Sequence, residues 1–299
     1  MDQTNSQDSY VFARNYKASA RLDLQHHLWR SQVNYLLHPS IPLSLSSPAL
    51  RVADVGTGTG TWLLDLARQL PPTAQLQGFD IDISQCPPKS WLPPNVTMRA
   101  LDALEDLAAD LVGKFDIVHV RLFMFVVEEP TLLLRNVVRM LSMLAMPLSL
   151  ALASLALSLL WKSRLEPDGW LQWEEYDNET AHTIKAHPGA DSSAFDALFQ
   201  KFAALSRKTK PLWVKTLHKD CEQQGLVDVN VFHHATSLER LPSMTDLFMM
   251  GWEELIGMVK DEEKAAELKN LFPRAVAETR RGLGYDMDRV TVVAKKGAS

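Results

Sequence analysis

A glycine-rich turn with an acid just ahead of it is the stretch of this sequence whose residue types and spacing could hold a ligand. Residues 52–60 read Val-Ala-Asp-Val-Gly-Thr-Gly-Thr-Gly, so Asp54 closes a short apolar run and glycines follow at 56, 58 and 60. Glycine lets the backbone turn sharply and come close to a ligand that a Cβ would hold away. The pattern therefore predicts a strand, a ligand-binding turn and then a helix.

The position of the third glycine bears on which ligand this turn suits. A dinucleotide fingerprint is Gly-x-Gly-x-x-Gly, whose third glycine packs the helix on the strand beside a pyrophosphate. Here the third glycine comes one position early, at Gly60, and Thr61 fills the place where it would be needed. S-adenosylmethionine (SAM) has no phosphate and carries a charged amino acid end, which backbone groups and a carboxylate such as Asp54 suit better. SAM is favoured, and an NAD enzyme, another nucleotide fold or a structural turn stay open.

A second acid lies at the distance expected of a nucleotide site. Residues 75–79 predict a strand that ends in Asp80, 20 residues beyond Gly60. Nucleotide sites of α/β proteins place at this spacing the carboxylate that binds the ribose hydroxyls. Asp82 is the competing candidate, and a solvated loop acid is the alternative for either residue.

Strands, helices and acids continue to alternate along the chain. Residues 96–99 predict a third strand that leads to Asp102, and the apolar run 115–120 is typical of a buried parallel strand. This order predicts a doubly wound α/β sheet. Helical segments within 178–283 predict substrate-side elements, and a chain of 299 residues with 46% hydrophobic content can bury a full core.

Taken together, these motifs resemble class I SAM-dependent methyltransferases, and more closely the fungal methyltransferases found with secondary-metabolite pathways. The stretches that carry the resemblance extend over most of the chain. They are Tyr-Lys-Ala-Ser-Ala-Arg-Leu near residue 16, Ala-Asp-Val-Gly-Thr-Gly-Thr-Gly-Thr-Trp (53–62), Gly-Phe-Asp-Ile (78–81), Trp-Leu-Pro-Pro-Asn-Val (91–96), Phe-Asp-Ile-Val-His-Val-Arg (115–121) and Pro-Asp-Gly-Trp-Leu-Gln-Trp-Glu-Glu (167–175).

The resemblance implies a mostly parallel seven-stranded sheet with an α-helical cap, SAM as cofactor, and methyl transfer to an oxygen or nitrogen of a small molecule. It implies a helical lid over residues 1–45, with Arg21 near the cofactor, and a SAM-binding domain over 46–299; a helix merely packed on the core is the alternative for the lid. The amino acid end of SAM would lie at the glycine turn, the ribose at the second acid and the adenine at the third. The cofactor-binding residues predicted in this way are Tyr16, Asp54, Gly56, Thr57, Gly58, Gly60, Asp80, Asp102, Ala103 and Arg121.

The acceptor side carries weaker signals. Methyl transfer needs a nucleophile placed in line with the methyl group, and much of the rate can come from that positioning. Glu174, Glu175 and His233 are candidates for a base, because open α/β sheets bind ligands at the carboxyl ends of their strands. A surface acid, or no base at all, is the alternative, and His119 is expected to be packed. The Met and Trp residues of 244–258 fit either a pocket or plain core.

Composition excludes several classes of partner. The net charge of −5 and the scattered basic residues argue against nucleic acid. Cys86 and Cys221 lack metal-site spacing, so no metal is expected. The polar N-terminus predicts a cytoplasmic protein. A second hypothesis, a SAM-binding methyltransferase-like regulator that acts through protein partners, would also allow a nuclear location.

One segment does not fit such a sheet. Residues 140–161 are 22 uncharged residues, long enough for the ~20 that span a membrane. They fall where a loop of ~2–6 residues suffices, so a membrane span there would pull a core element into the bilayer and is not expected. Residues 142–166 are an anomalous insertion that a translated intron would explain, if Ser142-Met143 is encoded AGT-ATG and Leu165-Glu166 TTA-GAG. Splicing would then join Leu141 through a new lysine to Pro167.

Overall fold

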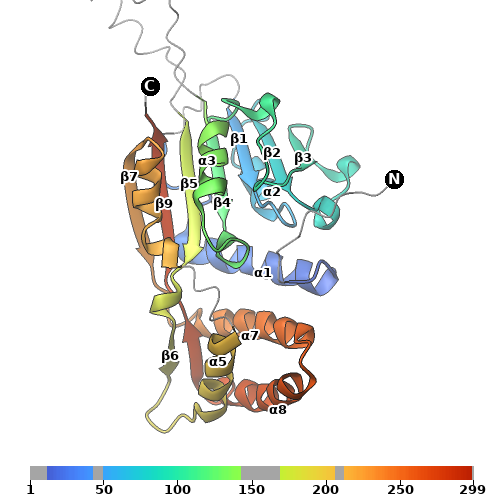
Figure 1. The fold of residues 1–299 in the computed structure, drawn as a ribbon, viewed down its shortest axis with the longest axis vertical. Helices are drawn as coiled ribbons and strands as arrows, with labels where there is room; N and C mark the ends of the chain where they lie inside the picture. The colour runs from blue at the N-terminus through green and yellow to red at the C-terminus, as the bar shows by residue number, and fades with distance from the viewer. Residues whose placement is uncertain (1–11, 43–49, 143–168, 206–211, 298–299) are drawn as a thin grey trace, which may run out of the picture.

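The computed structural model describes residues 12–42, 50–142, 169–205 and 212–297. Its centre is a seven-stranded sheet with the strand order β3-β2-β1-β4-β5-β9-β7 (Figure 1). β9 runs antiparallel to both of its neighbours, and the other paired strands are parallel. The predicted mostly parallel seven-stranded α/β sheet is therefore confirmed. The strands are β1 (Arg51–Val55), β2 (Gln75–Asp80), β3 (Val96–Ala100), β4 (Ile117–Arg121), β5 (Trp170–Tyr176), β7 (Leu226–His234) and β9 (Arg289–Lys296).

Helices cover the sheet and form a cap beside it. They are α1 (Tyr16–Val33), α2 (Thr61–Ala67), α3 (Thr131–Met140), α5 (Ser193–Leu205), α6 (Leu217–Gln223), α7 (Leu241–Met258) and α8 (Glu262–Thr279). Short 3-10 turns are η1 (Ile83–Gln85), η2 (Lys89–Trp91), η3 (Ala109–Leu111), η4 (Phe123–Phe125), η5 (Asn178–Thr180) and η6 (Leu212–Lys215). The cap consists of α5, α7, α8 and a two-stranded antiparallel sheet of β6 (His182–Lys185) and β8 (Leu283–Asp286).

α1 lies between the sheet and the cap, where it crosses the edge of the sheet and packs on α7 (Figure 1). The Asn15 side chain caps its first turn by accepting from the backbone N–H groups of Lys17 and Ala18. Asn34 ends the helix in the left-handed conformation at φ 60°. The sequence thus fixes both ends of the element that closes over the sheet.

Strand register decides which polar side chains meet. Asp54 in β1 pairs with His119 in β4, and Arg121 in β4 pairs with Glu174 in β5. The parallel strands are apolar on both faces at most other positions, as expected for a sheet covered on both sides. Three buried polar residues and the partly buried Arg121 therefore lie next to one another in the sheet.

The apolar segment of the sequence lies outside the described residues from Met143 onward, but both of its flanks are described. Ser142 donates its backbone N–H to the carbonyl of Phe115 at 2.7 Å, and Gly169 donates to the carbonyl of Ser142 at 3.2 Å. The chain therefore leaves and re-enters the sheet at neighbouring points. Of the described helices, none is both long and apolar enough to cross a membrane.

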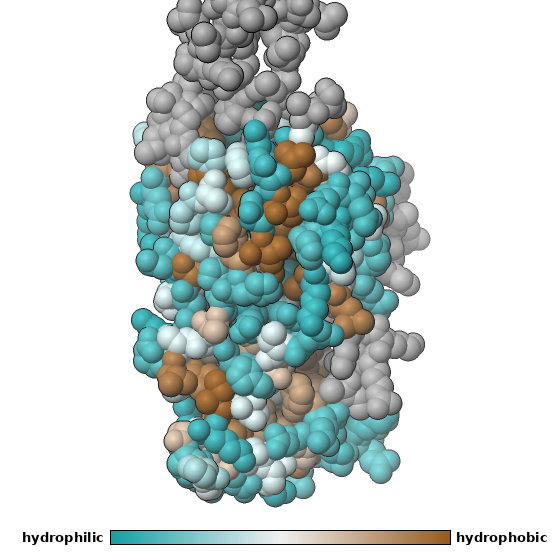
Figure 2. Space-filling view, turned by 90° about the vertical axis from the view of Figure 1, so that its left-hand side faces the viewer, coloured by the Kyte–Doolittle hydropathy of each residue, from teal (hydrophilic) through white to brown (hydrophobic). Residues whose placement is uncertain are grey.

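The surface shown in Figure 2 is mainly hydrophilic, and its hydrophobic residues form strips between polar ones. Large apolar side chains that are well exposed come from separate elements of the described chain, such as Trp91 on η2 and Leu238 before α7. Scattered exposure of this kind is ordinary in soluble proteins. The search for a ligand site therefore turns to the interior.

Candidate functional site

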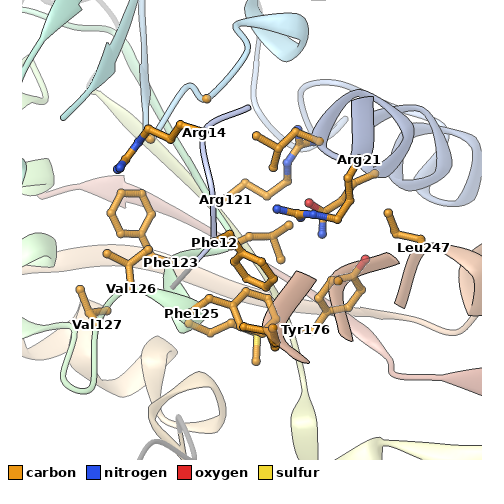
Figure 3. Close-up of a pocket in the computed structure, with 18 of the residues that line it drawn as sticks. Phe12, Arg14, Arg21, Arg121, Phe123, Phe125, Val126, Val127, Tyr176 and Leu247 are labelled. Atoms are coloured by element: carbon orange, nitrogen blue, oxygen red, sulfur yellow. The ribbon is translucent and has the colours of Figure 1, made fainter. Parts of the chain in front are cut away.

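A cavity of about 1040 Å³ lies between the carboxyl ends of the central strands, α1 and the cap. It reaches the top of the ~300–1,000 Å³ range of small-molecule sites, so it has room for a cofactor and a second molecule. Figure 3 shows Arg21 from α1, Arg121 from β4 and Tyr176 from β5 entering it from different sides, with Phe12 and Phe125 between them.

The glycine turn forms one wall of the cavity. Gly56, Gly58 and Gly60 all have positive φ, at +73°, +57° and +77°, a region that glycine occupies without strain. A Cβ on Gly56 would lie 2.4 Å from Cε2 of Phe123, which is closer than the packing allows. The backbone N–H groups of Gly56 and Thr57 donate to the carbonyl of Phe79, so the turn is tied to the end of β2.

α1 is hydrogen-bonded directly to this turn. Asp23 accepts hydrogen bonds from the hydroxyls of Thr59 at 2.7 Å and Thr61 at 2.5 Å. A methyl group of Leu22 lies 3.5 Å from the position of a Cβ on Gly58. The N-terminal helix therefore covers the turn, in the place where the resemblance puts a lid.

Asp80 lies at the end of β2, inside the cavity. Its carboxylate accepts from the backbone N–H of Gly58 at 2.9 Å and of Asp82 at 3.2 Å. Burial raises its pKa above the ordinary value, although both hydrogen bonds act in the opposite direction. Asp82 does not line the cavity, and its own carboxylate lies 3.5 Å from the guanidinium of Arg14. The geometry therefore favours Asp80 over Asp82 as a ligand group.

A buried histidine joins two carboxylates behind the turn. Nδ1 of His119 lies 2.7 Å from Asp54 and Nε2 lies 3.1 Å from Glu174, and all three side chains are almost fully buried. The Trp62 ring stacks on the imidazole at 3.7 Å with an interplanar angle of 2°. Because each ring nitrogen faces a carboxylate, both nitrogens act as donors when the imidazole is protonated.

Titration of these groups follows from their contacts. Burial by itself would lower the pKa of His119, but the hydrogen bonds to Asp54 and Glu174 raise it above its usual value. Burial would likewise raise the pKa of Glu174, but His119 and then Arg121 lower it. The charged forms of both groups therefore stabilise each other inside the protein.

A further chain of contacts connects this network to α1. Nη2 of Arg121 lies 3.2 Å from Nδ1 of His26, whose Nε2 lies 3.0 Å from Asp65 on α2. Burial, and then the charge of Arg121, lower the pKa of His26 to about 4. His26 is therefore neutral near pH 7, so it accepts from Arg121 and donates to Asp65.

Among the described residues, His26, His27 and Asp65 are the group whose donor atoms lie close enough to share a metal ion. Arg30 already lies 2.7 Å from the Asp65 carboxylate, and Arg68 lies 3.5 Å from it. These guanidinium groups neutralise the negative charge of the Asp65 carboxylate, which a bound cation would need. This group is therefore better described as an ion-pair cluster that anchors α1 on α2.

Most residues predicted to bind the cofactor line the cavity. Tyr16 does not, because it begins α1 with its ring turned to solvent and is 79% exposed. The role of Tyr16 at the cofactor therefore stays a prediction to which the cavity lining adds no support. Gly60 is also absent from the lining, since it lies beneath the turn near Met98. The predicted residues that do line the cavity are Asp54, Gly56, Thr57, Gly58, Asp80, Asp102, Ala103 and Arg121, and Arg21 joins them.

The three candidate bases do not line the cavity, so their role as a base stays a prediction without support from the cavity lining. β5 extends to Tyr176, so Glu174 and Glu175 lie within the strand rather than beyond its end. Glu174 is engaged with His119, as described above. His233 lies within β7 and is exposed on the surface.

Glu175 has a structural role instead. Its carboxylate accepts from the backbone N–H groups of Phe123 at 2.8 Å and Met124 at 3.2 Å, and from the Trp173 indole at 2.7 Å. Burial raises its pKa to about 8 in spite of these donors. Glu175 therefore holds η4, whose aromatic residues line the cavity.

Several lining residues are not apparent from the sequence. His119 was expected to be packed, and it is buried, yet it also lines the cavity, as does the buried Trp62. Trp252 is the member of the 244–258 group that reaches it most directly, whereas Met244 and Met249 are buried in the core. Their helical spacing in the sequence does not separate residues that line the cavity from residues of the core.

Residues 52–143 match the family model described as methyltransferase domain. Over 109 residues the chain is 40% identical to N-methyltransferase tcpN of Claviceps purpurea, which covers 36% of this chain and 38% of that protein. It is 33% identical over 120 residues to N-methyltransferase verN of Clonostachys rogersoniana, covering 40% and 41%. It is also 28% identical over 118 residues to secondary metabolism regulator LAE1 of Gibberella fujikuroi, covering 38% and 34%.

The chain therefore spans about two fifths of the length of the curated relatives it matches. The matched segment contains the glycine turn, β1 to β4 and α3, which include most of the cavity wall described above.

Proposed function

We propose that this chain, residues 52–143 of which match a methyltransferase-domain model, binds SAM in this cavity and transfers its methyl group to a nitrogen or oxygen of a small molecule. The observation that carries the proposal is the convergence of the glycine turn, Asp54, Asp80 and Asp102 on one cavity with room for two molecules. The N-methyltransferase names of two relatives support nitrogen as the first atom to test.

The residues present fit a SAM molecule. The left-handed glycines let backbone N–H groups approach the amino acid end, and the buried carboxylate of Asp54 offers a partner for its ammonium group. Asp80 would accept from the ribose hydroxyls, and Asp102 with Ala103 would border the adenine. When bound, SAM supplies an electrophilic methyl group on its sulfonium centre.

No base is assigned to the reaction. Of the described titratable side chains that line the cavity, His119 and His26 are engaged on both ring nitrogens, and Asp54 and Asp80 accept hydrogen bonds from the turn. Asp102 accepts from the backbone N–H of Leu104, and burial raises the pKa of Tyr176 and of Tyr285 above its ordinary value. Glu128 and Asp261 are exposed at the rim. We therefore propose that the chain accelerates transfer by holding an already nucleophilic acceptor in line with the methyl group and by excluding water.

A SAM-binding regulator is the second candidate, and the likeness to secondary metabolism regulator LAE1 is the observation that favours it. Both candidates require SAM to bind, so binding alone does not separate them. Product formation does, because a regulator that acts through protein partners needs no small acceptor.

The test begins with calorimetric titration of the purified protein with SAM, S-adenosylhomocysteine and NAD. Saturable binding of the first two without NAD binding supports the site, whereas NAD binding in their place overturns it. Incubation with methyl-labelled SAM and a panel of amines, amides and phenols then follows label in an organic extract. Labelled product supports the enzyme, and tight binding with no product from any of these acceptors favours the regulator.

A further inference from the structure

The cap side of the cavity is walled by aromatic rings that no step of cofactor binding uses. Phe199 and Phe202 come from α5, Trp252 from α7 and Tyr285 from β8, and all four line the cavity. The Trp252 ring lies 6.0 Å from Phe199, 5.5 Å from Phe202 and 5.2 Å from Tyr285, centroid to centroid. These four residues are called the cap aromatic cluster below.

Two more rings line the same cavity from outside the cap. Phe12, which precedes α1, and Phe125 on η4 meet edge to face at 5.9 Å, and both point into the cavity in Figure 3. Phe125, Phe199 and Trp252 are only partly buried although they belong to or border the core, because part of each ring faces the open space. Rings therefore face the cavity from α5, α7, β8, η4 and the segment before α1.

The charges near these rings are already paired. Arg21 makes an ion pair with Glu254 of α7 at 3.0 Å, and its guanidinium lies 4.3 Å from the Phe12 ring. Asp261 and Lys264 pair at 3.0 Å on the exposed rim. Nη2 of Arg21 is buried without a hydrogen-bond partner among the described residues, so it can donate to a neutral oxygen of the acceptor. A charged acceptor would lose its hydration beside groups that already form ion pairs.

A cationic acceptor is disfavoured for a second reason. Aromatic rings attract cations, so a ring-lined pocket can suit an ammonium group. Here the Arg21 guanidinium already occupies the face of Phe12, and Arg21 and Lys264 both line the cavity. The face of the Phe12 ring is therefore not open to a second cation.

We propose that the cap aromatic cluster, with Phe12 and Phe125, forms the acceptor subsite, and that the acceptor is an uncharged molecule with a planar ring system. Ring pairs stabilise one another by about 0.5–1.5 kcal/mol beyond the burial of their area, which makes a planar ring a better occupant than an aliphatic chain of equal size. The inference rests on the proposed function, since it assigns the second ligand of the same cavity.

The test uses probes that share one ring system and differ in charge. The full-length protein saturated with S-adenosylhomocysteine is titrated with 2-naphthalenemethanol, 2-naphthoate, 2-naphthylmethylammonium and the acyclic alcohol 1-decanol. We expect the neutral naphthalene to bind about tenfold more tightly than each of the others, equivalent to ~1.4 kcal/mol. Equal or tighter binding of the ammonium probe overturns the neutral assignment, and equal binding of decanol overturns the ring assignment.

Variants identify where the probe binds. Phe199→Leu and Trp252→Leu keep apolar bulk but remove a ring, so each is expected to weaken 2-naphthalenemethanol binding about tenfold. Trp91→Leu is the matched control, since Trp91 is 78% exposed and does not line the cavity. S-adenosylhomocysteine affinity should change less than about twofold in all three, which also reports that the fold is intact.

The outcomes separate this inference from the proposed function. A wild-type protein that fails to bind S-adenosylhomocysteine removes the proposed function. A protein that binds S-adenosylhomocysteine normally, but whose affinity for the neutral naphthalene is the same in the wild type and both cap variants, removes only the acceptor subsite. If Trp252→Leu no longer binds S-adenosylhomocysteine, Phe199→Leu supplies the decision, because that side chain is partly exposed and its loss leaves the core aromatic ring of Phe195 in place.

Discussion

His119→Gln is the substitution that most directly tests the buried network behind the glycine turn. The imidazole bridges Asp54 and Glu174 with both of its ring nitrogens, at 2.7 and 3.1 Å. A glutamine has one amide nitrogen to donate and presents an oxygen on its other side. One of the two carboxylates would therefore face an oxygen instead of a donor, in a position that water does not reach.

The expected loss of unfolding free energy follows from the one donor that glutamine lacks. Removal of one partner from a buried ion pair costs about 3–5 kcal/mol, and a hydrogen bond to a charged group that the glutamine retains returns about 1.5–3 kcal/mol. We expect His119→Gln to lower the free energy of unfolding by about 3 kcal/mol once the opposed oxygen is included. Adding Glu174→Gln should recover about 1–3 kcal/mol, because the second amide can donate to the first.

The assay is urea unfolding followed by far-ultraviolet circular dichroism, completed as a double-mutant cycle, with calorimetric titration of S-adenosylhomocysteine alongside. His233→Gln is the control, since His233 is exposed and should change the unfolding free energy by less than about 0.5 kcal/mol. The pKa of His119 is raised in the fold above 6.5, so its stabilisation is full below pH 6.5 and is lost as pH rises through the raised value. The gap between wild type and His119→Gln should shrink at high pH. Strictly additive losses of unfolding free energy in the double-mutant cycle would refute the bridging imidazolium. So would a difference in unfolding free energy between wild type and His119→Gln that widens as pH rises.

The remaining predictions concern the turn, η4 and the apolar segment. Asp80→Asn should weaken S-adenosylhomocysteine binding about 10–100-fold in a calorimetric titration, because one charged acceptor is lost, while Asp82→Asn should leave it within about threefold. Gly56→Ala forces a Cβ to within 2.4 Å of a phenylalanine ring at φ +73°, so the thermal midpoint and cofactor affinity should both fall. For Glu175, the pKa raised from 4.5 to about 8 means that its contribution is present below pH 4.5 and lost as pH rises towards 8; Glu175→Gln should abolish this slope in stability-versus-pH curves. A variant in which a single lysine replaces residues 142–166 should still fold and bind S-adenosylhomocysteine as judged by calorimetry, and failure to fold would contradict the insertion hypothesis.

The doubly wound α/β class of the sheet could be predicted because it depends on local signals. Apolar runs at 115–120, a glycine turn and acids at strand ends each mark a boundary within a few residues, and the alternation leaves little freedom in how the sheet is wound. The same signals identified Asp80 and Asp102 at the cavity. Both lie at or just beyond strand ends, where the backbone itself directs a side chain toward the ligand edge.

The network around His119 could not be predicted, because it depends on register between strands far apart in sequence. Asp54 and His119 are 65 residues apart, and His119 and Glu174 are 55 apart. Whether a buried histidine is packed or charged depends on which atoms face its two nitrogens. The sequence offers no such information until strand pairing aligns β1, β4 and β5.

Tyr16 and Glu175 show the corresponding limit for single side chains. Tyr16 starts α1, and a shift of one helical position turns a side chain by about 100°, so a correct lid still leaves the ring in solvent. Glu175 was placed beyond a strand that in fact continues to Tyr176. An error of three residues at the end of a strand thus makes a carboxylate within the strand look like one at its ligand-binding end.

The apolar segment is the place where sequence and structure together say more than either does alone. The length of the uncharged segment 140–161 is typical of a membrane span or an insertion. The sequence alone gives no distance between the residues on either side of this segment. The backbone N–H of Gly169 donates a hydrogen bond to the carbonyl of Ser142, and a Cβ on Gly169 would lie 2.8 Å from Cβ of Leu141. The residues on the two sides of the segment are therefore in contact. A short connection can therefore replace 142–166 without stretching the chain, since loops of ~2–6 residues commonly join such elements. Phe115 already pairs with Leu141 on one side of the junction, so the sheet does not need the intervening residues to align β5 with β4.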